Sequence, residues 1–229
     1  MASREYHTAL ESFPKGIAVP GDSYEDVRRK FAPAHGHDPG PDIEVESVRL
    51  AGVGGVWVRR KGEKTDRTLY FIHGGALVSC PAETYPFYAA WFVREAGAQA
   101  FLVDYRLAPE HRFPAALDDC VAGYRGLLAS GVDPKRVAFM GDSCGGGLAV
   151  ASLVRLRDLG APLPACAVAL SGWFDLEASG ESATNPVGED RFVNPVWIRE
   201  RGRDYVGPQG NPADPLHPRS TPTCAACRR

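Results

Sequence analysis

Long apolar runs, an excess of positive charge and an apolar leader are all missing from this sequence. Without an apolar run of about 20 residues we expect no membrane span. The 26 lysines and arginines are offset by 28 aspartates and glutamates, for a net charge of −2, which argues against nucleic acid or an anionic membrane as partner. Residues 1–16 carry charges and no apolar core, so we expect no secretion signal and a cytoplasmic location.

Cysteine is also sparse, and the spacing of the cysteines does not indicate a disulfide framework. Of the six cysteines, only Cys224 and Cys227 form a C-x-x-C pair. One isolated pair is a weak zinc signature, so we expect free thiols in a reducing compartment, no metal site and no cofactor. Internal repeats and low-complexity linkers are absent as well, and a length of 229 residues suits one domain with one core.

Apolar segments of strand length alternate with helical patterns from residue 43 onward. Such alternation predicts an α/β fold with a mostly parallel sheet covered by helices on both faces. The first two strands have no helix between them, which indicates that the sheet begins with an antiparallel entry, a pair of antiparallel strands. Gly52, Gly54 and Gly55 are expected to turn the chain into the second strand. The expected strands are 43–50, 56–60, 68–72, 98–105, 136–141 and 165–171, and the expected helices are 81–97, 114–130, 145–159 and 195–206, after a capped helix start at 23–26.

The strongest functional motif is G-x-S-x-G at residues 141–145, between an expected strand and an expected helix. A serine on such a sharp turn is exposed and strained, and the N-terminus of the helix favours developing negative charge. Glycines at both ends let the strand and the helix pass closely enough for the turn to form. We therefore predict Ser143 as a nucleophile, with Asp142 in a supporting role. The alternative is a glycine-rich turn that only happens to contain a serine.

A second motif, His73-Gly74-Gly75, ends the third expected strand. Acyl transfer needs backbone N–H donors aimed at the oxyanion, and such a loop supplies them together with the residue after the serine. This assigns Gly74, Gly75 and Cys144 as donors, and an ordinary tight turn is the alternative. His73 precedes the serine, whereas the catalytic histidine of this arrangement follows the serine and the acid. We interpret His73 as a residue that braces the loop.

Residues 104–119 read D-Y-R-L-A-P-E-H-R-F-P-A-A-L-D-D, a charged loop whose chemistry is not evident from spacing alone. Together with the two glycine motifs, this string resembles the bacterial carboxylesterases of the hormone-sensitive-lipase-like family, and Glu110 is part of the shared motif. The resemblance extends from Ile43 to Leu216. Departures from the family pattern include Ala76, where a third glycine is usual, and Cys144, where alanine is common.

The resemblance implies an α/β-hydrolase fold in a single domain, 1–229, with cap-type segments at 1–42 and about 174–212. It also implies a serine hydrolase of carboxylic esters with short acyl chains, acting through an acyl-enzyme on the predicted nucleophile. Trp173 and Phe174 are expected to narrow the acyl pocket. The expected partner is a small-molecule ester.

A catalytic acid and a catalytic histidine are missing from their expected places. The family carries both well beyond the serine, on the last two core strands, and the only histidine after Ser143 is His217. We do not assign His217 as the base, because it lies among prolines with no apolar strand before it. We therefore expect both groups to be absent, the fold to lack its last core strands, and esterase activity to be impaired.

Residues 217–229 resemble no segment of the family. One permitted back-translation, read in a shifted frame, gives A-S-A-L-Y-A-D-L-R-G-L-P-P-L, which is similar to what the family carries after Asp-Pro-Leu. We interpret 217–229 as an out-of-frame tail that follows a single-base insertion or deletion near codon 217. The strand at 165–171 then becomes an exposed sheet edge, through which copies of the chain could pair.

Two other functions stay open on the sequence alone. A non-catalytic truncated homologue or small-molecule binder would keep the fold without turnover, because a fold does not decide a function. An amidase or arylformamidase-like hydrolase would use the same serine on a different carbonyl. Labelling with a fluorophosphonate asks whether Ser143 is activated.

Overall fold

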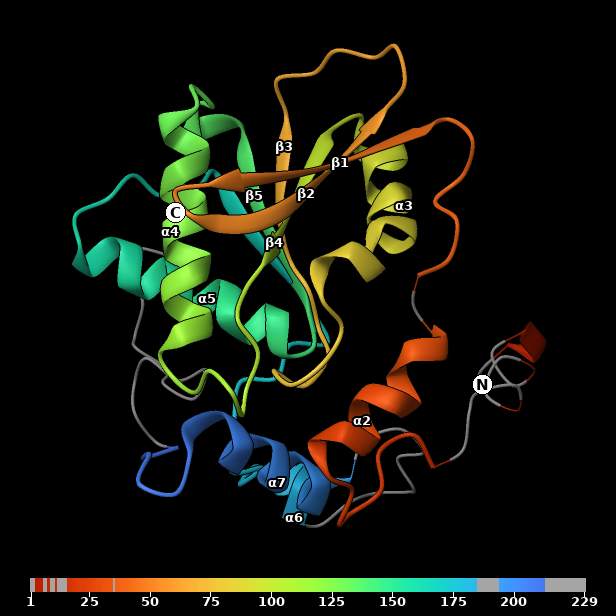
Figure 1. The fold of residues 1–229 in the computed structure, drawn as a ribbon, viewed down its shortest axis with the longest axis vertical. Coiled ribbons are helices and arrows are strands. Elements are labelled where there is room, and N and C mark those ends of the chain that lie inside the picture. Colours follow the sequence, from red (N-terminus) through yellow and green to blue (C-terminus); the bar gives the residue numbers. More distant parts are fainter. Residues whose placement is uncertain are drawn as a thin grey trace.

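One six-stranded sheet forms the centre of the computed structural model, which describes residues 16–34, 36–184 and 194–212 and positions 3–5, 8 and 11. Figure 1 shows this sheet among its helices. The strand order is β1-β2-β4-β3-β5-β6. The β1–β2 and β2–β4 pairs are antiparallel and the other three are parallel, which confirms the predicted antiparallel entry. The strands are β1 (Ile43–Leu50), β2 (Val53–Arg60), β3 (Thr68–Ile72), β4 (Gln99–Asp104), β5 (Val137–Asp142) and β6 (Cys166–Leu170).

Helices cover both faces of this sheet, as predicted. Tyr70 and Phe71 are adjacent in β3 and therefore point to opposite faces. The Tyr70 ring meets Tyr124 of α4 at a centroid distance of 5.7 Å. The Phe71 ring meets Tyr88 of α3 at 6.0 Å. α5 packs beside α4 and against β5 and β6. The three helices are α3 (Pro86–Ala96), α4 (Ala115–Ala129) and α5 (Cys144–Asp158).

A row of aromatic rings crosses the buried middle of the sheet. The strand register places Trp57 opposite Phe101, Phe101 opposite Tyr70, and Tyr70 opposite Phe139. Centroid distances along the row are 5.3, 5.8 and 5.0 Å. The Tyr70 hydroxyl donates to the backbone oxygen of Cys120 at 2.8 Å, so its polar end is satisfied. Because each such ring buries roughly 150–250 Å², the row joins four strands into one core.

Two expected boundaries are wrong. β2 begins at Val53, so Gly54 and Gly55 lie inside the strand and do not form the turn before it. A Cβ on Gly55 would meet the Phe101 ring and would lie 2.9 Å from the Leu102 backbone oxygen. Glycine is needed here because β4 approaches closely, which a local turn signal cannot reveal. The helix expected at 81–97 begins later, at Pro86, after a short 3₁₀ turn.

Two segments far apart in the sequence form a layer beyond the carboxyl ends of the parallel strands, at the bottom of Figure 1. Phe31 stacks on Trp197 with a centroid distance of 6.3 Å. The Glu200 carboxylate accepts the Gly21 amide at 3.0 and 3.1 Å. The division of these segments into a cap stays a prediction. The helices of the layer are α2 (Tyr24–Phe31), α6 (Glu181–Thr184) and α7 (Pro195–Val206).

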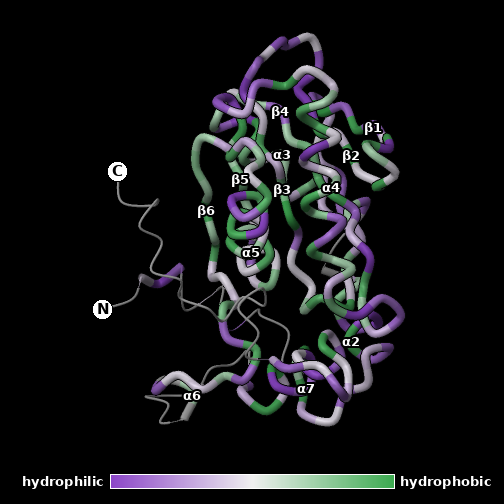
Figure 2. Tube along the Cα trace, turned by 90° about the vertical axis from the view of Figure 1, so that its left-hand side faces the viewer, coloured by the Kyte–Doolittle hydropathy of each residue, from purple (hydrophilic) through white to green (hydrophobic). Residues whose placement is uncertain are grey.

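β6 is an edge of the sheet and is apolar throughout, as Figure 2 shows. Four of its five residues are exposed, and Val168 is 43% exposed. A parallel strand is normally buried on both faces, so this strand has the composition of a central strand in an edge position. The predicted exposed edge at 165–171 is confirmed for the described residues. Across all the residues that the structure describes, no helix has both the length and the apolar character of a membrane span.

Gly55 provides a test of how closely β2 and β4 pack. Gly55→Ala is expected to lower the free energy of unfolding by roughly 1–3 kcal/mol, because the added methyl group overpacks against Phe101. Gly180→Ala is the matched control, since a Cβ there meets nothing within 4 Å and the free energy should change little. Urea unfolding followed by fluorescence measures both. Equal effects of the two substitutions would contradict the packing described here.

Candidate active site

Ser143 occupies the turn between β5 and α5 with a strained backbone. Its φ of 52° and ψ of −124° fall outside the regions that residues with a Cβ favour. The Ser143 amide donates to the Leu170 backbone oxygen at 2.9 Å, and the Ser143 backbone oxygen accepts the Trp173 amide at 2.8 Å. The turn is thus held by β6 and by the segment that follows it. A strained serine at a strand-to-helix turn has the geometry of a nucleophile elbow.

The glycines on either side of Ser143 are required by close packing. A Cβ on Gly141 would meet the backbone of Gly145. A Cβ on Gly145 would meet the Ile72 backbone oxygen and would lie 2.6 Å from that of His73. The elbow therefore presses against the end of β3, and this contact brings the loop after β3 beside the serine.

The amides of the loop after β3 differ in their hydrogen bonds. The Gly74 amide donates to Oδ1 of Asp142 at 3.0 Å, and its expected role as an oxyanion donor stays a prediction. Ala76 has a φ of 58° and continues the turn that Gly75 begins with a φ of 111°. Among the described residues, the amides of Gly75, Ala76 and Cys144 donate to no partner. The sequence did not predict the positive φ of Ala76, because alanine rarely adopts this conformation.

Asp142 connects this loop to β5. Its carboxylate accepts the Gly74 amide and, at 3.1 Å, the hydroxyl of Tyr85. Burial, followed by the nearby negative charge of Asp142, raises the pKa of Tyr85, so Tyr85 stays a donor at ordinary pH. Tyr85 was not identified from the sequence, since nothing local marks it. Asp142 therefore contacts both the loop and Tyr85, and its supporting role stays a prediction.

His73 is fully buried at the base of the same loop. Its ring stacks on Tyr105 with a centroid distance of 4.1 Å and an interplanar angle of 11°. Nδ1 of His73 lies 2.8 Å from the Gly74 backbone oxygen, and the Tyr105 hydroxyl donates to the His73 backbone oxygen at 2.8 Å. These contacts fit a bracing residue, and that role stays a prediction.

Glu110 joins the N-terminal layer to the core. Its carboxylate accepts two hydrogen bonds of 2.8 Å from the Arg28 guanidinium of α2. Arg28 also donates to the backbone oxygens of Val78 and Ala108, at 2.7 and 3.2 Å. The Arg28 guanidinium lowers the pKa of Glu110 to about 2. Arg28 thus contacts the loop that continues from the Gly75 turn, a link that separate motifs did not indicate.

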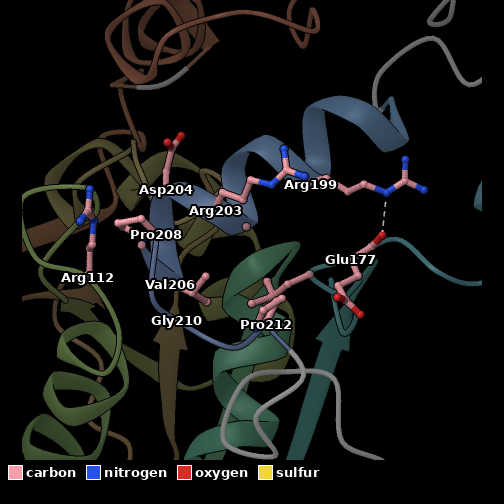
Figure 3. A pocket seen from close by; sticks show the side chains of 12 residues that line it. Arg112, Glu177, Arg199, Arg203, Asp204, Val206, Pro208, Gly210 and Pro212 are labelled. Atoms are coloured by element: carbon pink, nitrogen blue, oxygen red, sulfur yellow. Dashed lines mark hydrogen bonds between the residues drawn. The ribbon is translucent and has the colours of Figure 1, made fainter.

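Two hollows lie near these elements. A pocket of about 650 Å³ lies against α7, and Arg199 there donates to the Glu177 backbone oxygen at 2.8 Å (Figure 3). Ser143 does not line it. A smaller pocket of about 220 Å³ lies between α2 and the segment after the Gly75 turn. The larger pocket is lined by Arg112, Leu176, Glu177, Arg199, Gly202, Arg203, Asp204, Val206, Gly207, Pro208, Gly210 and Pro212, and the smaller by Arg28, Ala32, Ser79, Cys80, Pro81, Thr84 and Leu107.

No general base contacts the serine within the described part of the chain. The Ser143 side chain makes no hydrogen bond to any residue there. His217 and the whole 217–229 tail lie outside the described residues, so neither prediction about them is tested. Among the residues with a described placement, no group of three or more His, Cys, Asp or Glu side chains is arranged to hold a metal ion.

The Arg28–Glu110 pair gives a pH-dependent prediction. The pKa of Glu110 is lowered, so the pair stabilises fully above about pH 4.5, the ordinary value, and loses its effect as pH falls towards about 2. Because Glu110 is 48% exposed, Glu110→Gln should lower the free energy of unfolding by no more than about 1 kcal/mol at pH 7. The cost should shrink as pH falls through this range, as measured by urea unfolding at several pH values.

The control for this prediction is Glu63→Gln, which removes a comparably exposed ion pair with Arg60 far from α2. Limited proteolysis should release the segment around α2 faster only in the Glu110 variant. Equal cleavage of both variants would show that Glu110 does not hold α2.

Comparison with known proteins places these features in a family. A family model described as alpha/beta hydrolase fold matches residues 69–228. An acetyl-hydrolase of Streptomyces hygroscopicus is 39% identical over 166 residues, which is 72% of this chain and 54% of that protein. The putative acetyl-hydrolase LipR of Mycobacterium tuberculosis is 38% identical over 162 residues, covering 71% and 52%. The chain thus spans about half the length of these relatives.

Solved structures agree with this assignment. An esterase from the bacterial hormone-sensitive lipase family superposes with a TM-score of 0.83 at 38% identity, covering 94% of this chain and 73% of that one. A hormone-sensitive lipase from a metagenome library superposes with a TM-score of 0.81 at 31% identity, covering 94% and 72%. The predicted fold class and family are confirmed: the chain belongs to the α/β-hydrolase fold family, in its hormone-sensitive-lipase-like branch of esterase and lipase lineage.

Proposed function

We propose that this protein is a serine hydrolase of carboxylic esters, with Ser143 as its nucleophile. The observation that carries the proposal is the strained serine at the β5–α5 turn, next to a loop with unengaged amides. In the proposed reaction, Ser143 Oγ attacks the ester carbonyl carbon and the alcohol departs with a proton. Water then hydrolyses the acyl-enzyme and releases the acid.

The oxyanion formed by this attack would accept hydrogen bonds from backbone amides. We propose Gly75, Ala76 and Cys144 as the donors, with Ala76 in place of Gly74 because the Gly74 amide is engaged by Asp142. Cys144 is the first residue of α5, where the helix N-terminus also favours negative charge. Removing one such donor costs roughly 10²–10³ in kcat in a well-studied protease.

The substrate is proposed to have a short acyl chain. The backbone of Trp173 is hydrogen-bonded to that of Ser143, and the Trp173 indole donates to the Asp175 backbone oxygen at 2.7 Å. Phe174 folds over Gly172, where its ring lies against the position of a Cβ. We propose that these two rings, which follow the segment bonded to Ser143, limit the length of the acyl chain. Two relatives are named acetyl-hydrolases, which agrees with this proposal.

Turnover by the 229-residue chain is proposed to be impaired. A serine hydroxyl needs a base to take its proton, and no described residue hydrogen-bonds the Ser143 side chain. In serine proteases that lack the triad, binding and the oxyanion hole leave roughly 10³–10⁴-fold acceleration over water. The same observation favours a second candidate, a non-catalytic homologue that binds small molecules.

Ser143→Ala tests the nucleophile. We expect it to abolish both fluorophosphonate labelling and the hydrolysis of p-nitrophenyl acetate, because the attacking oxygen is removed. Ser130→Ala, at the end of α4, is the control and should leave both signals unchanged. p-Nitrophenyl octanoate should be a poorer substrate than p-nitrophenyl acetate. An acyl anilide should be hydrolysed more slowly still, and preferred hydrolysis of the anilide would indicate an amidase. Labelling that survives Ser143→Ala would refute the assignment, and a parent chain that neither labels nor turns over would favour the binder.

We also propose that copies of the chain pair through β6. The opposite edge strand, β1, carries Glu44, Glu46 and Arg49, charges of the kind that protect an edge from pairing. β6 has no charged residue and exposes its apolar side chains. Two β6 strands would satisfy each other's backbone groups without bringing like charges together.

Val168→Lys should shift the chain from oligomer to monomer, because a charge on β6 opposes pairing. Val45→Lys is the matched control: Val45 is 44% exposed on β1 and Val168 is 43% exposed on β6. Light scattering after size exclusion measures the mass of both variants and the parent. A monomeric parent, or the same shift in both variants, would exclude pairing through β6.

A further inference from the structure

The Cys144 side chain joins three parts of the candidate site. Its Sγ accepts the Leu77 amide at 3.2 Å and lies 3.8 Å from the Tyr105 hydroxyl. Cys144 begins α5, Leu77 belongs to the loop after β3, and Tyr105 follows β4. Cys144 is 1% exposed and Leu77 is fully buried, so water does not compete for these contacts. Alanine at this position could make neither contact.

The protons in this cluster can be assigned from its hydrogen bonds. Tyr105 has a single hydroxyl proton, which it donates to the His73 backbone oxygen at 2.8 Å. The contact between Tyr105 and Cys144 therefore uses the thiol proton, which points to the Tyr105 oxygen. Burial raises the pKa of Cys144 to about 12, so the group stays a thiol at ordinary pH. The sulfur thus accepts from one segment and donates to another.

The loop that Cys144 contacts needs such restraint. Ala76 and Leu77 have φ values of 58° and 67°, a left-handed conformation that residues with a Cβ disfavour. The Leu77 backbone oxygen accepts the Ala108 amide at 2.9 Å, and the Gly75 oxygen accepts the amides of the next turn. Within the described residues, Cys144 supplies the side-chain hydrogen bond to the Leu77 amide. Without it, a buried amide would be left unpaired in a strained turn.

We propose that the Cys144 thiol is a positioning residue that holds the Gly75–Leu77 turn against the elbow and thereby aims the Gly75 and Ala76 amides at the carbonyl attacked by Ser143. The proposal rests on the function proposed above. Cys144 does not touch the reacting atoms through its side chain. Its effect is transmitted by the Leu77 amide, which follows the two proposed donors directly in the chain.

Hydrogen exchange of the Leu77 amide tests the restraint without requiring activity. Cys144→Ala should speed this exchange roughly five- to tenfold, the effect of losing one ordinary hydrogen bond. Cys144→Ser should restore most of the protection, because a hydroxyl both accepts and donates. Cys120→Ala is the matched control: Cys120 is also fully buried, and the Leu77 exchange should not change. Amides of β3 serve as the reference for global unfolding.

Hydrolysis of p-nitrophenyl acetate by the same variants tests the positioning role. Cys144→Ala should lower kcat roughly tenfold and leave KM within about twofold, because an oxyanion contact acts in the transition state. Cys144→Ser should recover most of kcat. Unchanged Leu77 exchange, or faster exchange with unchanged kcat, would overturn the proposal. A parent chain no faster than its Ser143→Ala variant would instead refute the proposed function, and the exchange data would still decide whether Cys144 restrains the turn.

Discussion

The close passage of α5 across the end of β3 is the constraint on which the candidate site depends. Gly145 lies where any side chain would meet the backbone oxygens of Ile72 and His73. This contact forces the chain to turn sharply at Ser143, and it brings the loop after β3 beside the serine. One steric requirement therefore produces both the strained residue and its neighbouring amides.

Polar contacts then decide which of those amides remain available. Asp142 engages the Gly74 amide and Cys144 engages the Leu77 amide, while the Gly75 and Ala76 amides between them have no partner among the described residues. The Arg28–Glu110 pair adds a link from α2 to the backbone of the same loop. A strained turn persists only when its surroundings restrain it, and this loop is held from three directions.

The strands of the sheet differ in how deeply they are buried. The aromatic row from Trp57 to Phe139 lies in the protected middle, where helices cover both faces. β6 has an equally apolar sequence but little cover. Since β6 holds the Ser143 amide through Leu170, the least protected strand is also one of the supports of the elbow. Any partner that covers β6 would therefore stabilise the serine as well.

The sequence by itself determined the α/β class, the order of strands and helices along the chain, and the elbow at Ser143. These features depend on local periodicity and on glycines that a local turn requires. It also indicated the family through three short motifs. Only the tertiary structure decided that Gly54 and Gly55 belong to β2, that the Gly74 amide is engaged by Asp142, and that Ala76 has a positive φ. Those features arise from contacts between segments distant in the chain, such as β2 with β4 and the β3 loop with β5. A local pattern carries no information about which distant backbone atom will approach it.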